Sequence, residues 1–266
     1  MKRIAILASG LLATQFACAG VYVETVKHNL TTNTTEPEQK MYVQDGNGRF
    51  VDPEGRASLI KGDTLYIIDE NDKSYIAMDQ ATMQQVAKQV QAAMDRMKEQ
   101  MAKLPPEQRQ QMEQMMGGSA AVLQGKQRTV DVKDTGKSDK VDGRACKLWD
   151  VTRDGALDQQ ICVVPYSALP GKENFQQLFA NFAKVFEEMA KSVPMLSGMM
   201  ANEFSAQTKV NGFPVRQRNY DEGGKLVDDE TLVKVWREEA IPASTFEIPA
   251  GYKKKSLPMG PGGPGM

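Results

Sequence analysis

Hydrophobic and polar residues alternate in short runs over the first part of the chain, and turn-forming residues separate these runs. Residues 21–30 form the first run, and residues 41–44 are followed by Asp45-Gly46-Asn47-Gly48, a strong hairpin signal. Such loops are too short for the crossover connections that parallel strands require. The pattern therefore predicts an antiparallel meander, which three further runs continue: residues 57–60, 64–69 and 73–78.

The spacing of the apolar residues changes to steps of three and four between residues 83 and 104, which predicts one long amphipathic helix. Asp79 is placed to cap the start of this helix, and Pro105-Pro106 is placed to end it. Methionines dominate the apolar stripe. On the face that we expect to line a cavity, the helix carries Met83, Val86, Val90, Met94, Met97 and Met101.

The same spacing returns over residues 175–189 and predicts a second amphipathic helix, this time rich in phenylalanine. Asn174 and Gln177 have the spacing of a capping box, and Pro194 ends the helix. We expect this stripe to line the same cavity. Its ligand-lining residues are predicted to be Phe175, Leu178, Phe179, Phe182, Phe186 and Met189.

Strand-like runs flank the second helix, and the last two form a hairpin around Gly223-Gly224. Residues 256–266 are rich in glycine and proline and hold too few apolar side chains to bury a core, so we expect a disordered tail. The prediction is a single α+β domain over residues 20–255. Its later strands are residues 128–132, 145–152, 157–164, 215–220 and 226–236, with short helical pieces at 107–116 and 195–206.

The first 19 residues have the layout of a cleaved signal peptide. Lys2 and Arg3 precede an apolar run at residues 4–13, which is too short to span a bilayer, and Ala17-Cys18-Ala19 is a small-residue cleavage site. Cleavage after Ala19 predicts an exported, periplasmic protein without an integral membrane segment. Two alternatives stay open: an uncleaved membrane anchor, and lipidation of Cys18, although lipoprotein signals usually have leucine where this chain has Gln15.

Charge excludes some partners. Of the 266 residues, 33 are Lys or Arg and 34 are Asp or Glu. Removing Lys2 and Arg3 leaves 31 basic and 34 acidic side chains, a net charge of −3. Nothing in this balance favours binding to nucleic acid or to an anionic membrane surface. We therefore expect no nucleic-acid partner.

Loss of Cys18 would leave Cys146 and Cys162, which bracket a predicted hairpin. If Arg153-Asp154-Gly155 forms a three-residue loop, residues whose numbers sum to 308 pair, and the two cysteines face each other directly. A structural disulfide is the favoured interpretation for an exported chain. A redox-active pair is the alternative, but such pairs usually form a C-x-x-C motif at a helix start.

No catalytic signature is present, so we expect a protein that is not an enzyme and needs no cofactor. His28 is the only histidine, which leaves no second imidazole for a zinc site or a proton relay. The spacing of Met94 with Met97, and of Met112 with Met115, fits soft thioether ligation of copper or silver. The same spacing is what a helix needs to face a core, and packing is the favoured interpretation, with no metal site.

Three segments carry a resemblance to a known family. Residues 59–69 (LIKGDTLYIID) and 73–78 (KSYIAM) resemble paired strands, and residues 246–252 (FEIPAGY) resemble a closing strand and turn, of the LolA-like superfamily of periplasmic lipoprotein carriers. The chain is most similar to an uncharacterised secreted bacterial family with that fold. The resemblance implies an unclosed antiparallel β-barrel, a half-barrel, whose concave face is covered by amphipathic helices. No functional residue is carried over from it.

The sequence is compatible with two main functions. The preferred hypothesis is a periplasmic binding module that holds an acyl chain or lipid between the curved sheet and the two helices. The alternative is an envelope interaction or scaffold protein, with an envelope protein as partner, whose helices simply complete the core. Copper binding through methionine is a weaker third hypothesis.

Overall fold

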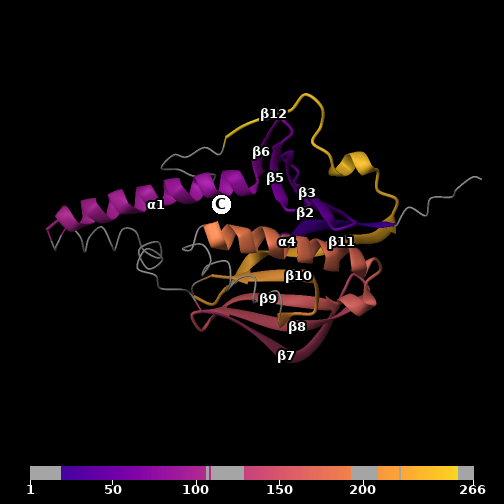
Figure 1. Ribbon diagram of the computed structural model, residues 1–266. Coiled ribbons are helices and arrows are strands. Elements are labelled where there is room, and N and C mark those ends of the chain that lie inside the picture. The colour runs from indigo at the N-terminus through magenta and orange to yellow at the C-terminus, as the bar shows by residue number, and fades with distance from the viewer. Residues whose placement is uncertain (1–18, 106–107, 109–128, 193–208, 222, 257–266) are drawn as a thin grey trace, which may run out of the picture.

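The computed structural model describes residues 19–105, 108, 129–192, 209–221 and 223–256. One sheet and two long helices, α1 (Gln80–Lys103) and α4 (Lys172–Ser192), make up most of this part (Figure 1). The strands are β1 (Gly20–Asn29), β2 (Thr34–Gln44), β3 (Asn47–Val51), β4 (Arg56–Lys61), β5 (Thr64–Asp69), β6 (Ser74–Met78), β7 (Val130–Val141), β8 (Arg144–Arg153), β9 (Ala156–Pro165), β10 (Gly212–Tyr220), β11 (Leu226–Glu239) and β12 (Lys253–Lys254).

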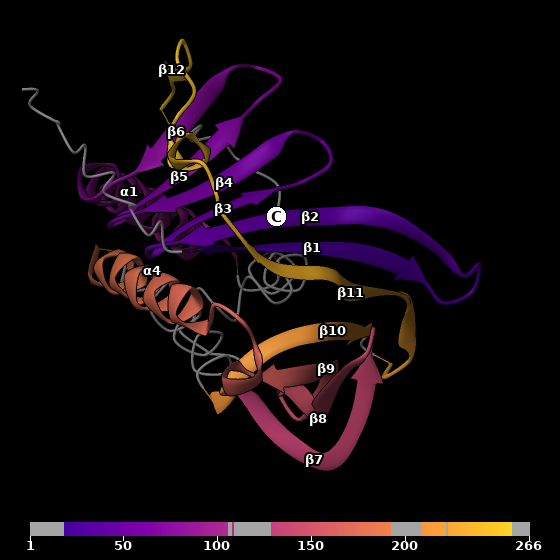
Figure 2. The same ribbon diagram turned by 90° about the vertical axis from the view of Figure 1, so that its right-hand side faces the viewer.

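These strands form a single 12-stranded sheet in the order β12-β6-β5-β4-β3-β2-β1-β11-β10-β9-β8-β7. The two edge strands, β7 and β12, do not pair with each other, so the strongly curved sheet stays open (Figure 2). Every pairing is antiparallel except that of β12 with β6. The predicted meander and the predicted final hairpin are confirmed, as is the unclosed sheet.

Of the closing strand and turn predicted at residues 246–252, the strand is wrong and the turn is present. A short 3-10 helix, η2 (Ala243–Phe246), stands at its start, and the chain pairs with the sheet only at Lys253 and Lys254. Pro249 has no backbone N–H to give to a strand ladder, and its carbonyl accepts from Tyr252 N in a turn. The side chain of Phe246 instead packs with Leu59 and Ile68 in a second core cluster.

Helix α1 begins as predicted, because Asp79 Oδ1 accepts a hydrogen bond of 2.8 Å from Thr82 N. The same bond lowers the pKa of the Asp79 carboxyl. The capping box predicted for α4 is wrong, since the helix already begins at Lys172 and Asn174 lies in its first turn. There Asn174 Oδ1 accepts from Asp45 N at 3.1 Å and ties the helix to the β2–β3 turn.

Helix α4 contacts β2, β3 and β4, while α1 contacts α4 and β6. The first turns of α4 are part of the main core. Phe175 is 1% exposed, and its ring stacks on Trp236 of β11 with centroids 4.9 Å apart. Asn181 Nδ2 donates to Gly46 O at 2.9 Å, so a second polar contact anchors the helix to the same turn. Several predicted segments lie outside the described residues: residues 1–18 of the predicted signal peptide, all but residue 108 of the predicted helical piece at 107–116, the predicted piece at 195–206, and residues 257–266 of the predicted tail.

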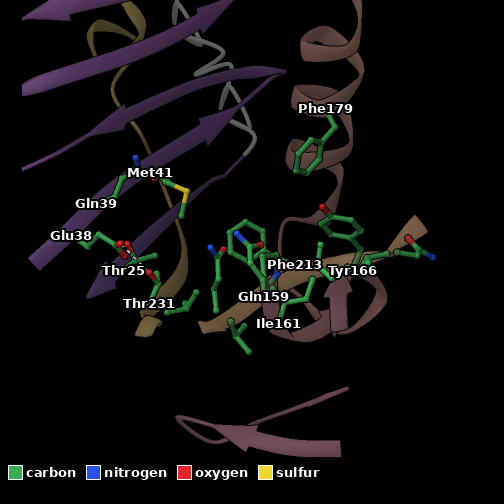
Figure 3. A pocket seen from close by; sticks show the side chains of 18 of the residues that line it. Thr25, Glu38, Gln39, Met41, Gln159, Ile161, Tyr166, Phe179, Phe213 and Thr231 are labelled. Atoms are coloured by element: carbon green, nitrogen blue, oxygen red, sulfur yellow. Dashed lines mark hydrogen bonds between the residues drawn. The ribbon is translucent and has the colours of Figure 1, made fainter. Parts of the chain in front are cut away.

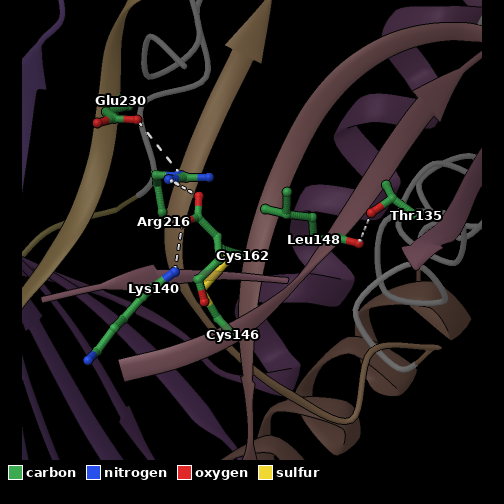
Figure 4. The surroundings of a disulfide bond; sticks show 8 residues. Thr135, Lys140, Cys146, Leu148, Cys162, Arg216 and Glu230 are labelled. Atoms are coloured by element: carbon green, nitrogen blue, oxygen red, sulfur yellow. Dashed lines mark hydrogen bonds and ion pairs between the residues drawn. A yellow bond between two sulfur atoms is a disulfide. The ribbon is translucent and has the colours of Figure 1, made fainter. Parts of the chain in front are cut away.

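Cys146 and Cys162 form the expected disulfide, with 5.4 Å between their Cα atoms (Figure 4). The predicted register is wrong, because Leu148, not Cys146, lies opposite Cys162. Asp154 and Gly155 form a two-residue turn, both with positive φ, and Asp158 adds an extra residue to β9. The bridge therefore joins diagonal neighbours, at a separation that disulfides commonly span.

Candidate functional site

A pocket of about 730 Å³ lies between α4 and the middle strands of the sheet (Figure 3). β1, β2, β8, β9, β10 and β11 contribute to its lining, together with the short 3-10 helix η1 (Tyr166–Ala168) and the residues that precede β10. Its volume is typical of small-molecule binding sites. The apolar lining residues are Met41, Val151, Ile161, Tyr166, Phe179, Val210, Phe213, Pro214, Val215 and Val233, and the polar ones include Thr25, Glu38, Gln39, Gln159, Gln176, Asn211, Gln217 and Thr231.

The regular strand pairing is interrupted where the strands line this pocket. Thr25 pairs with Gln39 and the next residue of β1 pairs with Pro37, so Glu38 is an extra residue in β2. Val215 is an extra residue in β10 by the same reasoning. Such bulges bend a strand and re-aim side chains, and they are frequent beside functional sites. The bulges in β2 and β10 thus bend the sheet beside the pocket, and the two bulge residues, Glu38 and Val215, lie in the pocket wall.

One side of the pocket is aromatic. Tyr166 of η1 meets Phe179 of α4 edge to face, with ring centroids 6.1 Å apart. Phe213 of β10 also lines the pocket. Its ring packs edge to face with the rings of Phe175 and Trp236. Burial raises the pKa of the Tyr166 hydroxyl, which therefore stays neutral and keeps its proton. This side offers apolar contact area with one hydroxyl.

The other side of the pocket is polar. Thr25, Glu38 and Thr231 gather there, away from Tyr166 and Phe179 (Figure 3). Thr231 Oγ1 donates a hydrogen bond of 2.9 Å to Glu38 Oε1. The pocket is therefore amphipathic, with an aromatic side and a side that carries a carboxylate.

The predicted ligand-lining residues occupy different environments. Phe179 lines the pocket, whereas Phe175, Leu178 and Met83 are buried and Phe182 packs against the core. Val86 lines a second recess, of about 530 Å³, beside Lys254 and Lys255. The side chains of Val90, Met94, Met97, Met101, Phe186 and Met189 lie outside the described residues, so the predictions for them, including copper ligation, stay predictions.

Sequence reasoning missed the strand residues that form most of the pocket wall. Gln159 and Ile161 of β9 are two residues apart and both line it, as do Thr231 and Val233 of β11. A spacing of two places side chains on one face of a strand, so the alternation within these strands was the available signal. The apolar stripes of the two helices, with their spacing of three and four, led the prediction to place the lining residues on the helices instead of the strands.

Comparison with known proteins places the chain in a family. Residues 60–252 match the family described as "Domain of unknown function (DUF4412)". The chain belongs to the DUF4412 family. The matched span includes the pocket residues from β8 to β11 and α4, while Thr25, Glu38, Gln39 and Met41 precede it. A comparison with curated proteins gave no match.

Two solved structures are similar to this DUF4412 chain at low sequence identity. An uncharacterized conserved protein from Thermus thermophilus has 7% identity and a TM-score of 0.43, with 89% of each chain covered. MucB, solved in complex with MucA(peri), has 9% identity and a TM-score of 0.31. The similarity covers 88% of this chain but 55% of the MucB chain. At TM-scores below 0.5, neither similarity bears on function.

The DUF4412 chain also has a group of charged residues on the face of the sheet opposite the pocket. Gln217 lines the pocket, so its neighbours Arg216 and Arg218 project the opposite way. Glu230 is buried between them: Arg218 Nε donates to its Oε2 at 2.6 Å, and Arg216 Nε lies 3.9 Å from the same atom (Figure 4). His28 hydrogen-bonds Asn33 and Glu230, and these bonds raise the pKa of its imidazole. This network pairs its charges internally and stabilises the face opposite the pocket.

Two further findings concern only the part of the chain that the structure describes. Within it, no three His, Cys, Asp or Glu side chains are grouped so that they could hold a metal ion. Neither α1 nor α4 is long and apolar enough, over its described residues, to cross a membrane.

Proposed function

We propose that this DUF4412 protein is a non-enzymatic binding protein for an apolar ligand, an acyl chain or another part of a lipid. The observation that carries the proposal is the pocket of about 730 Å³ with its aromatic side at Tyr166, Phe179 and Phe213. Pockets of this size that combine apolar walls with a few polar groups are the usual form of small-molecule sites.

We further propose that the protein works in the periplasm after loss of its first 19 residues. The disulfide between Cys146 and Cys162 supports this, because structural disulfides persist in oxidising compartments. An exported carrier of this kind would shield an acyl chain from water. It would need no metal or cofactor for that task.

A scaffold role is the second candidate, with an envelope protein as the partner. The first turns of α4 favour it, because Phe175 and Leu178 are buried in the core as a purely structural helix would require. Phe179, the residue after Leu178, lines the pocket instead. The two functions therefore differ in one testable respect, which is whether the pocket takes up a ligand.

Filling the pocket should abolish uptake of an apolar probe. Gln159 lies in the pocket wall and is half-buried, so the indole of Gln159→Trp would occupy the space at modest cost to folding. We expect the variant to bind N-phenyl-1-naphthylamine at least about tenfold more weakly than the wild type, a loss of about 1.4 kcal/mol. Fluorescence titration of the purified protein measures this.

Gln160→Trp is the matched control. Gln160 is the next residue of β9, is also half-buried, and projects to the opposite face, where its Nε2 donates to Asp150 Oδ1 at 3.0 Å. This variant should bind the probe like the wild type. Equal affinity in the wild type and in both variants would show that the probe binds elsewhere. Absence of uptake by the wild type would favour the scaffold role.

A further inference from the structure

The polar side of the pocket contains a single charge. Among the described residues that line the pocket, Glu38 is the only one with an ionisable acidic or basic head, apart from the neutral Tyr166 hydroxyl. As the bulge residue of β2, Glu38 is aimed by a specific backbone irregularity. Its side chain therefore sets the electrostatics that a bound ligand meets.

Only one of the two carboxylate oxygens of Glu38 is satisfied. Oε1 accepts from the Thr231 hydroxyl, whereas Oε2 is buried and has no hydrogen-bond partner among the described residues. A buried carboxylate oxygen without a donor costs free energy, and a ligand that supplies a donor recovers it. The carboxylate of this pocket-lining residue thus lacks one hydrogen-bond donor among the described residues.

The nearby cations of the protein have other partners. Lys27 Nζ lies 2.9 Å from Asp229 Oδ2. Arg216 and Arg218 lie on the opposite face of the sheet, where Asp139 and Glu230 pair with them. Lys27 also attracts Glu38 electrostatically. No ion pair within the described part of the chain joins Glu38 to a cation, so its carboxylate stays available to a ligand.

We propose that the pocket selects amphiphiles whose polar head is a cationic N–H donor, such as an alkylammonium group, over those with a carboxylate head. This inference rests on the proposed function, since the apolar part of the ligand would contact Tyr166, Phe179 and Phe213. An ammonium bound beside the Glu38 carboxylate donates to it in a charge-assisted hydrogen bond. Because Oε2 is buried, the Glu38 side chain must rotate toward the pocket for that oxygen to accept the bond. A carboxylate head would meet Glu38 as a like charge.

Three amphiphiles with one chain length and different heads test the proposal. Dodecylamine, dodecanol and dodecanoate are added at pH 7 at concentrations where each is dissolved as single molecules, and displacement of N-phenyl-1-naphthylamine is measured. Dodecylamine is then an ammonium ion and dodecanoate an anion. We expect dodecylamine to displace the probe at a concentration about tenfold lower than dodecanol, and dodecanoate to be the weakest of the three.

Glu38→Gln keeps the size of the side chain and an oxygen for Thr231 but removes the charge. It should bring dodecylamine to the affinity of dodecanol. Glu36→Gln is the matched control, since Glu36 lies two residues earlier in β2, is exposed and is not among the lining residues. It should leave the head-group order unchanged.

The outcomes separate this inference from the proposed function. Equal displacement by all three amphiphiles, or an unchanged order in Glu38→Gln, would overturn head-group selection and leave ligand binding intact. Failure of the wild type to take up the probe would overturn both. The comparison of head groups on the wild type needs no variant, so the test holds even where Glu38→Gln folds poorly.

Discussion

Replacing Phe175 with alanine is expected to lower the free energy of unfolding by about 3–5 kcal/mol. The side chain is 1% exposed and its ring stacks on Trp236. The ring of Phe213 packs edge to face with it, with centroids 5.3 Å apart. Removing the ring deletes buried apolar area and leaves a cavity among aromatic side chains that cannot collapse easily. Equilibrium unfolding in urea measures the loss.

Phe179→Ala is the control on the same helix. Phe179 is half-buried and lines the pocket, so its removal should cost clearly less stability than Phe175→Ala while weakening probe uptake more. Equal losses of stability at the two positions would contradict the division of α4 into a core part and a pocket part. That result would favour a helix that serves the core along its whole length.

Removing the disulfide is expected to cost about 3 kcal/mol, from the loop-closure entropy of the 16-residue separation. Cys162 is fully buried and Cys146 is 3% exposed, so the double variant Cys146→Ser, Cys162→Ser also buries polar hydroxyls in the main core cluster. Urea unfolding of the oxidised wild type and of the variant, compared at one temperature, measures the difference.

A reductant supplies the control for that measurement. It should destabilise the wild type by less than the double variant loses, because reduction removes the loop closure without burying hydroxyls, and it should leave the double variant unchanged. Thiol labelling of the denatured, unreduced protein that lacks residues 1–19 should find no free cysteine. Two labelled thiols for each chain, or equal stability with and without reductant, would contradict a structural bridge.

The strands were predictable wherever a turn signal fixes their ends. Asp45-Gly46 turns β2 into β3 because both residues adopt positive φ, which glycine and aspartate tolerate better than most residues. The cysteine pairing was predictable, but its register was not. An extra residue such as Asp158 shifts the register without leaving a mark in the alternation of apolar residues.

The candidate site was predictable only in part, for a related reason. The apolar stripe on α4 identified side chains that avoid water, and both Phe175 and Phe179 belong to it. Spacing on a helix does not distinguish a side chain against its neighbours from one beside a cavity. Whether a helix side chain lines the pocket depends on where the opposing sheet bends away from it, which the bulges at Glu38 and Val215 determine. Bulges of this kind arise from tertiary packing.

The central claim is that the pocket holds a lipid-like molecule, and analysis of co-purified material tests it most directly. The protein is purified without detergent and extracted with organic solvent, and the extract is examined by mass spectrometry beside those of Gln159→Trp and Gln160→Trp. We expect one or a few amphiphiles, near one molecule per chain, in the wild type and in Gln160→Trp, and little in Gln159→Trp. The same trace amounts in all three samples would contradict the account.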